Sequence, residues 1–523
     1  MISNPPTRTK VSDPVYDLIH SMSRMEKRYF NINTQSIKNN RGKIPDYCAL
    51  FEILDKMKTF DKVKAEQKLL QKLGKESFSN FTVKKNELYD VLMKSLRNFS
   101  FKQTKKSADY IKLLIRDANF LFKRGLFKDT ERHLKEARKL AEKCGDTISL
   151  IEINRFEREY ILTTRSKNMD KKLKEIHEEG IFLMKKLNEE EEIRRDYDLI
   201  AAKRAQNSKL TNDENIKKFK SKFSHLFKLE KRQDLSNLSK RYLANALFQY
   251  HYLLEGNEPY LQQTLILLNW WEDNEIWLNQ SPHFYIGALS NLLTAYGRLG
   301  RYDEYLYVLK KIENIKPNNQ YEESMRFHRL MINRQVYFLN KGLIDEVCNL
   351  SFAIEKGIKN HKLNEGVQIV LMFNVIVAFF VNKKYKECIR WIGLYDSFKK
   401  MGIVKIQIQF AQILKLISFY ELEDLDQLEK HIKSTERYFN NNLKLSRHSL
   451  DNIILRTLKR MGKVIPKEQA KIINELKITL NELPIKTKRR LGFDETDLWV
   501  TSKKEGKTII QLLKERNIKK EKP

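Results

Sequence analysis

The fold is clearest in IGALSNLLTAYGRLGRYDEYLYVLKKIENIKP, which spans Ile286 to Pro317. Apolar residues recur there at helical spacing before Gly300, and a second apolar stripe begins at Tyr302. Gly300 interrupts the first stripe, and Pro317 closes the second. The stretch therefore predicts two antiparallel helices joined by a tight turn. One such pair cannot bury both of its stripes, so further pairs must stack against it.

The same unit recurs along the chain with a period of about 41 residues. The residues that follow successive turns are separated by 42, 41, 40 and 41 positions. They are Tyr302, Ile344, Tyr385, Leu425 and Pro466. An ordinary helical bundle has no reason to keep this spacing, whereas stacked repeats must keep it. We therefore predict an all-α fold, an α-solenoid of antiparallel helix hairpins.

The repeat covers only part of the chain, and we predict three segments. Residues 1–105 contain helical stretches without the hairpin pattern and are interpreted as an N-terminal helical cap unit. Residues 106–483 form the solenoid, although the repeat is hard to follow between 147 and 240. Residues 484–523 form a C-terminal cap with a basic tail. Terminal units of a solenoid are atypical because each covers a neighbour on one side only.

Composition agrees with a helical protein and raises the question of an acidic partner. The 523 residues include 99 Lys and Arg against 67 Asp and Glu, a net charge of +32, with only 17 Gly and 10 Pro. Positive charge is concentrated in residues 1–150, 201–250 and 451–523. Many solvated helix faces would account for this balance. It would also suit nucleic acid or an anionic membrane surface.

Several classes of function are disfavoured by what the sequence lacks. The four cysteines form no C-x-x-C pair, so neither a disulfide framework nor a zinc site is expected. There is no G-x-S-x-G or H-E-x-x-H motif, and we predict a non-enzymatic protein without cofactor or metal. The N-terminus has no apolar core of a signal peptide, and no apolar run is long enough to span a bilayer. The expected location is the cytoplasm.

The hairpin sequence resembles the tetratricopeptide repeat superfamily. That family places an apolar or small residue within the first helix, an aromatic near its end, Gly at the turn, an aromatic after it, a small residue in the second helix and a closing Pro. These places hold Leu293, Tyr296, Gly300, Tyr302, Tyr305 and Pro317. Tyr305 departs from the pattern, and the period exceeds the family's, which is about 34. The resemblance implies a tetratricopeptide-like solenoid with lengthened helices. The stretch Ser23 to Phe30 is also similar to uncharacterised bacterial proteins of this build, which implies no function.

Three asparagines occupy the same place in successive hairpins. Asn291, Asn333 and Asn374 each lie nine residues before the turn residue. The resemblance implies that first helices line a concave surface and that asparagines at this place bind peptides. An amide both donates and accepts hydrogen bonds, so it can pair with a peptide backbone without reading side chains. We expect these residues to face the groove of a scaffold that binds a protein or an extended peptide, although chance could also place them there.

The alternative function is a nucleic-acid-binding regulator, with the solenoid as sensor. Three helical stretches between residues 46 and 101 have short connections, as in a helix-turn-helix. On the third of them, the candidate phosphate contacts are Lys84, Lys85, Lys94 and Arg97. The competing interpretation is a plain helical cap, because the same stretch carries apolar residues such as Leu88 and Leu92. The sequence favours the cap.

Overall fold

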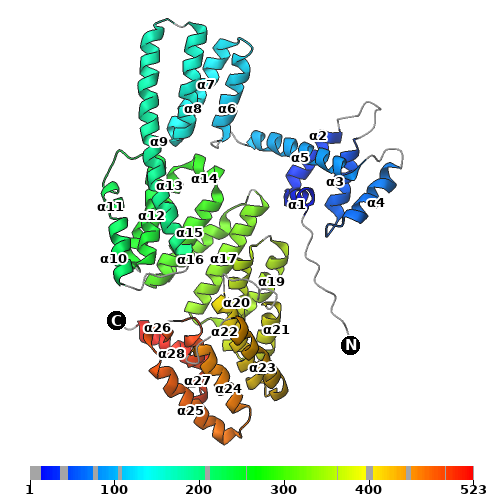
Figure 1. The fold of residues 1–523 in the computed structure, drawn as a ribbon, viewed down its shortest axis with the longest axis vertical. Coiled ribbons are helices and arrows are strands. Elements are labelled where there is room, and N and C mark those ends of the chain that lie inside the picture. Colours follow the sequence, from blue (N-terminus) through cyan, green and yellow to red (C-terminus); the bar gives the residue numbers. More distant parts are fainter. Residues whose placement is uncertain are drawn as a thin grey trace. The chain divides into compact units, whose positions relative to one another are not determined.

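The computed structural model describes residues 13–35, 45–74, 80–103, 109–165, 167–205, 213–254, 256–317, 319–361, 363–395, 405–442, 449–488 and 490–521. Within these ranges every regular element is a helix and none is a strand, which confirms the predicted all-α class (Figure 1). Nor is any helix in them long and apolar enough to cross a membrane. The chain divides into two compact units, Met1–Glu323 and Ser324–Pro523.

The first unit begins with a small helical bundle. Its helices are α1 (Pro14–Ser21), α2 (Arg24–Gln35), α3 (Asp46–Lys56), α4 (Lys62–Leu73) and α5 (Phe81–Gln103). They pack on one another, and one apolar cluster from Val15 to Leu92 forms their core. Phe30 and Phe51 meet inside it with ring centroids 4.5 Å apart. The segment predicted as an N-terminal unit therefore has a core of its own.

Two hairpins follow in the first unit, and their helices lie side by side (Figure 1). They are α6 (Asp109–Phe122), α7 (Phe127–Cys144), α8 (Thr147–Thr164) and α9 (Met169–Ala205). With 37 residues, α9 extends beyond α8 and also packs against α12. This long helix explains why no regular repeat is visible in that part of the sequence.

The remaining helices of the first unit continue the stack from α9. They are α10 (Asp213–Lys222), α11 (Leu226–Leu229), α12 (Asn237–Leu253), α13 (Asn257–Asp273), α14 (Glu275–Gln280), α15 (Pro282–Leu299) and α16 (Tyr302–Asn314). α12 packs on α13, α13 on α15, and α15 on α16. Helices that neighbour one another in sequence are therefore also neighbours in space, as stacked hairpins require.

The second unit has the same sequential packing around a larger apolar core. Its helices are α17 (Gln320–Asn340), whose first turn precedes the unit boundary, α18 (Ile344–Asn349), α19 (Ser351–Asn360), α20 (Glu365–Val381), α21 (Tyr385–Tyr395), α22 (Lys405–Glu421), α23 (Leu425–Asn442), α24 (Leu450–Met461), α25 (Pro466–Glu482), α26 (Ile485–Lys488), α27 (Phe493–Glu505) and α28 (Ile509–Glu521). Trp499 of α27 is buried in this core, and its Nε1 donates to Glu421 over 2.8 Å. The C-terminal helices thus share the core of the repeats before them.

The predicted period is confirmed by the positions at which helices begin. All five positions found from the sequence are first residues of helices, namely of α16, α18, α21, α23 and α25. In four of these hairpins the residue two places earlier is left-handed, with φ between 57° and 70°. These residues are Gly300, Gly342, Lys383 and Glu423. The amide that follows each one donates to the carbonyl five residues back, which closes a Schellman turn. One backbone turn is thus repeated in hairpins of both units.

Candidate functional site

Asn291 is held where three helices of the first unit meet. Its Oδ1 accepts a hydrogen bond from Nη2 of Arg204, near the end of α9, over 3.3 Å. Its backbone carbonyl accepts from the hydroxyl of Tyr260 on α13 over 3.1 Å. Burial raises the pKa of Tyr260 to about 12, so this hydroxyl remains protonated at neutral pH and can donate. The asparagine on α15 is therefore fixed by α9 and α13.

Two arginines stack on one tyrosine beside this asparagine. The guanidinium carbons of Arg204 and Arg298 each lie 4.2 Å from the ring centroid of Tyr252 on α12. Arg298, on α15, also lies 5.3 Å from the centroid of Tyr260. Its Nη1 is buried and has no hydrogen-bond partner. Within the described part of the chain, no carboxylate pairs with either arginine. We call Arg204, Tyr252, Asn291 and Arg298 the arginine site.

The arginine site has the chemistry of a receptor for a carboxylate or another anion. An aromatic ring stabilises a guanidinium group that lies over its face, and the N–H edge stays available for hydrogen bonds. The two oxygens of a carboxylate match the fork of that edge. Partly buried positive charge without a counter-charge is unfavourable, and an incoming anion would relieve this cost.

The other two predicted asparagines lie in the second unit and are engaged in its packing. Asn333 is only 5% exposed, and its Nδ2 donates to the carbonyl of Arg329 over 2.7 Å. Asn374 donates to Oε1 of Gln335 over 3.2 Å, which links α20 to α17. That all three asparagines face a groove stays a prediction, although Asn333 is buried and Asn374 is bonded to a neighbouring hairpin. A shared place in the repeat does not bring the three into one kind of environment.

The predicted nucleic-acid contacts on α5 divide into two pairs. Lys84 lies 3.3 Å from carboxylate oxygens of Asp46 and of Glu87. Lys85 lies 2.6 Å from an oxygen of the buried Asp13, the residue that caps α1. These two lysines therefore join α5 to other helices of its bundle. The remaining two, Lys94 and Arg97, lie on the exposed side of α5.

In the described ranges, no group of three or more His, Cys, Asp and Glu side chains could hold a metal ion. Sequence reasoning singled out Asn291 but missed Arg204, Tyr252 and Arg298, which come from three helices. No protein-family model matches this chain, and neither does any curated protein.

Proposed function

We propose that this protein is a non-enzymatic scaffold of the cytoplasm that binds a partner protein through an extended, acidic peptide segment. The observation that carries the proposal is the pair of guanidinium groups over Tyr252, for which the described chain supplies no carboxylate. A peptide carboxylate would complete these donors. The tetratricopeptide-like organisation belongs to the same proposal.

The position of Asn291 supports a peptide rather than a small anion as ligand. Its Oδ1 is occupied by Arg204, which leaves Nδ2 as a donor for a peptide carbonyl. A main-chain contact of this kind lies directly beside the two arginines. The site could therefore hold a backbone segment and its acidic side chain, or its terminal carboxylate, at the same time.

The test compares partner capture by two double variants of the full chain. In Arg204→Gln with Arg298→Gln, the side chains can still pack but the charge is lost. In the control, Arg116→Gln with Arg132→Gln, the same charge is removed from exposed positions on α6 and α7. We expect the wild-type protein and the control to retain a partner from native lysate, and the arginine-site variant to lose it. The captured partner's acidic segment, made as a peptide, should then bind the wild type directly.

Equal capture by all three proteins would overturn the proposal. The second candidate function is a nucleic-acid-binding regulator, which the net charge of +32 favours. Nuclease treatment of the lysate distinguishes it from the peptide-binding scaffold. If capture requires nucleic acid and is lost on nuclease treatment, the second candidate replaces the first. The pairing of Lys84 and Lys85 with carboxylates lowers its support, because these lysines would have to exchange one anion for another.

A further inference from the structure

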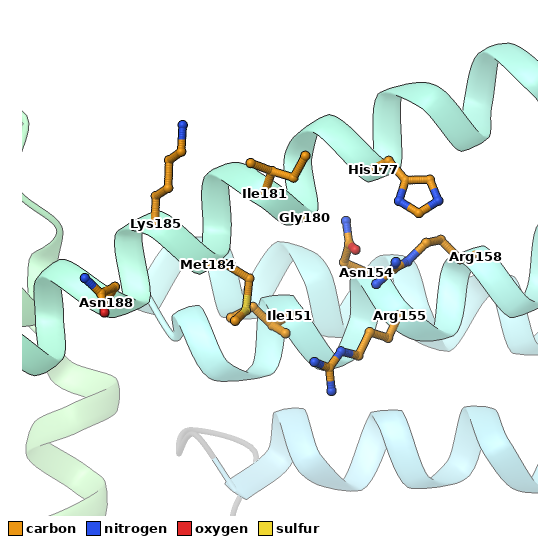
Figure 2. A pocket seen from close by; sticks show the side chains of 10 residues that line it. All are labelled: Ile151, Asn154, Arg155, Arg158, His177, Gly180, Ile181, Met184, Lys185 and Asn188. Atoms are coloured by element: carbon orange, nitrogen blue, oxygen red, sulfur yellow. The ribbon is translucent and has the colours of Figure 1, made fainter.

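A groove of about 650 Å³ runs between α8 and α9 in the first unit (Figure 2). Its apolar lining, called the floor below, consists of Ile151 on α8 with Ile181 and Met184 on α9. We call this surface the α8–α9 groove. Its lining shares no residue with the arginine site, so the two surfaces can be altered independently.

The lining charges of the α8–α9 groove are all positive. Arg155 and Arg158, with the imidazole of His177, lie toward one end of the apolar floor, and Lys185 lies toward the other (Figure 2). Nε of Arg158 is buried and has no hydrogen-bond partner. Among the described residues that line the groove there is no Asp or Glu. The groove thus has apolar surface between cationic ends.

Two acidic residues of α8 and α9 pair with an arginine outside the groove. Glu157 of α8 and Glu179 of α9 both form ion pairs with Arg138 of α7, the latter over 2.5 Å. At about 100° per residue, Glu179 lies on the other side of the buried Leu183 from Met184. The ion pairs with Arg138 therefore hold these two carboxylates outside the lining of the groove.

The helix pair is held together directly under the groove. Asn154 of α8 is 1% exposed, and its Nδ2 donates to the carbonyl of Ile176 over 2.9 Å and to Glu179 over 2.8 Å. A Cβ atom at Gly180 would lie 3.0 Å from Oδ1 of Asn154, which is tighter than most such contacts. Glycine thus permits the close approach of α9 to α8.

The shape of the groove restricts what can occupy it. Ile181 is 60% exposed and Met184 50% exposed, so a small molecule would stay largely in water, whereas small-ligand sites enclose most of their ligand. Among the described lining residues the imidazole of His177 is the only aromatic ring, and no Phe, Tyr or Trp is present to stack on a base. An apolar floor also offers nothing to phosphates. A helix with an apolar stripe flanked by carboxylates matches both the floor and the charges.

We propose that the α8–α9 groove binds an acidic amphipathic α-helix of a partner protein. The apolar stripe of that helix lies on Ile151, Ile181 and Met184, and its carboxylates pair with Arg155, Arg158 and Lys185. Burial of the exposed isoleucine and methionine supplies the affinity. The cations supply orientation and the preference for an acidic partner.

The test selects peptides of about 15 residues, long enough for several helical turns, from a random displayed library against the full-length protein. The groove variant carries Arg155→Glu with Lys185→Glu, and a floor variant carries Ile181→Ser. The control, Lys139→Glu with Lys172→Glu, makes the same charge change at exposed positions outside the groove. Melting temperatures establish that all variants are folded.

Selected peptides should carry apolar residues at i, i+3, i+4 and i+7 with Asp or Glu beside them. Their affinity should fall about tenfold or more in the groove variant and in the floor variant, and stay within about twofold in the control. Arg204→Gln with Arg298→Gln should also leave it unchanged. The proposal is overturned if no acidic helical sequence is enriched, if the arginine-site variant abolishes binding, or if the floor variant has no effect while an oligonucleotide displaces the peptides.

Discussion

The role of a residue depends on its neighbours in space. The three predicted asparagines show how far a position in the repeat determines those neighbours. All three lie nine residues before a turn, and that spacing could be read from the sequence. Their partners could not, because the spacing does not show which polar side chain of a neighbouring helix reaches each amide: Arg204 for Asn291 and Gln335 for Asn374. Arg204 also lies in the long α9, where no repeat was visible.

One glycine in the second unit makes room for an aromatic ring. A Cβ atom at Gly357 of α19 would lie 1.9 Å from Cζ of Phe327 on α17. Gly357→Ala should therefore displace the ring and lower the free energy of unfolding by about 1–3 kcal/mol, as in other overpacked cores. Gly393 of α21 is the matched control, because no atom lies within 4 Å of its added Cβ. Urea unfolding should show that Gly393→Ala raises stability by about 0.5–1 kcal/mol.

A buried histidine should make the second unit sensitive to acid. Desolvation lowers the pKa of His328 to about 4, and the neighbouring Arg329 acts in the same direction. The unfolded chain, with a histidine pKa of about 6.5, therefore binds a proton that the folded state does not bind between these values. Stability should be complete above about pH 6.5 and fall by roughly 2–4 kcal/mol as the pH drops to about 4.

The pH effect is measured as a difference between two proteins. The wild type and His328→Gln are unfolded with urea at intervals from pH 7 to about pH 4. The variant should lose less stability over that range, since other titrating groups contribute equally to both. Parallel pH dependences of the two proteins would contradict the assignment to His328.

At the level of elements, turns and helix starts were predictable because they depend on local chemistry. A left-handed turn residue followed by an apolar helix start can be recognised in a single sequence, as at Gly342 and Ile344. The 37-residue α9 has no such pattern in its sequence, since it packs against both α8 and α12. Hairpins were therefore found, whereas the helices between residues 147 and 240 were not resolved into units.

Two of the four repeated turns lack glycine, and this should cost stability. Lys383 and Glu423 adopt φ values of 57° and 58°, a region in which a side chain is unfavourable by about 1 kcal/mol or more. Glycine at either position should therefore raise the free energy of unfolding by about 0.5–1 kcal/mol. Lys384→Gly, one residue further on, does not sit at a left-handed position and should be destabilising. Thermal melts of the three variants would decide, and a loss of stability in Lys383→Gly would count against the turn geometry.

For the whole molecule, the sequence predicted one continuous array between terminal units, whereas contacts divide the chain at Glu323 and Ser324. The division falls within α17, where the sequence carries an unbroken helical pattern. No turn residue or change of composition marks the boundary there. The N-terminal bundle is different, because its apolar cluster ends at Leu92 and its helices pack on one another. The boundary between two apolar cores can therefore be recognised in the sequence only where the repeat pattern also ends.

The separate core of the N-terminal bundle predicts that this segment folds alone. Residues 1–105, expressed as a fragment, should show helical circular dichroism and a cooperative thermal transition, because small domains with one core unfold in this way. Leu54→Ala, which empties a fully buried position in α3, should cost about 2–5 kcal/mol and abolish that transition or move it strongly down. A fragment without cooperative melting would show that the bundle depends on later helices.

Helix α9 carries residues of both proposed binding surfaces, Met184 in the α8–α9 groove and Arg204 in the arginine site. At 1.5 Å per residue these positions are separated by roughly 30 Å along one helix axis. The helix would therefore hold two bound ligands at a fixed separation. A single partner could occupy both surfaces only if its linker spans that distance, which takes about ten extended residues, and a longer flexible linker would gradually lower the avidity.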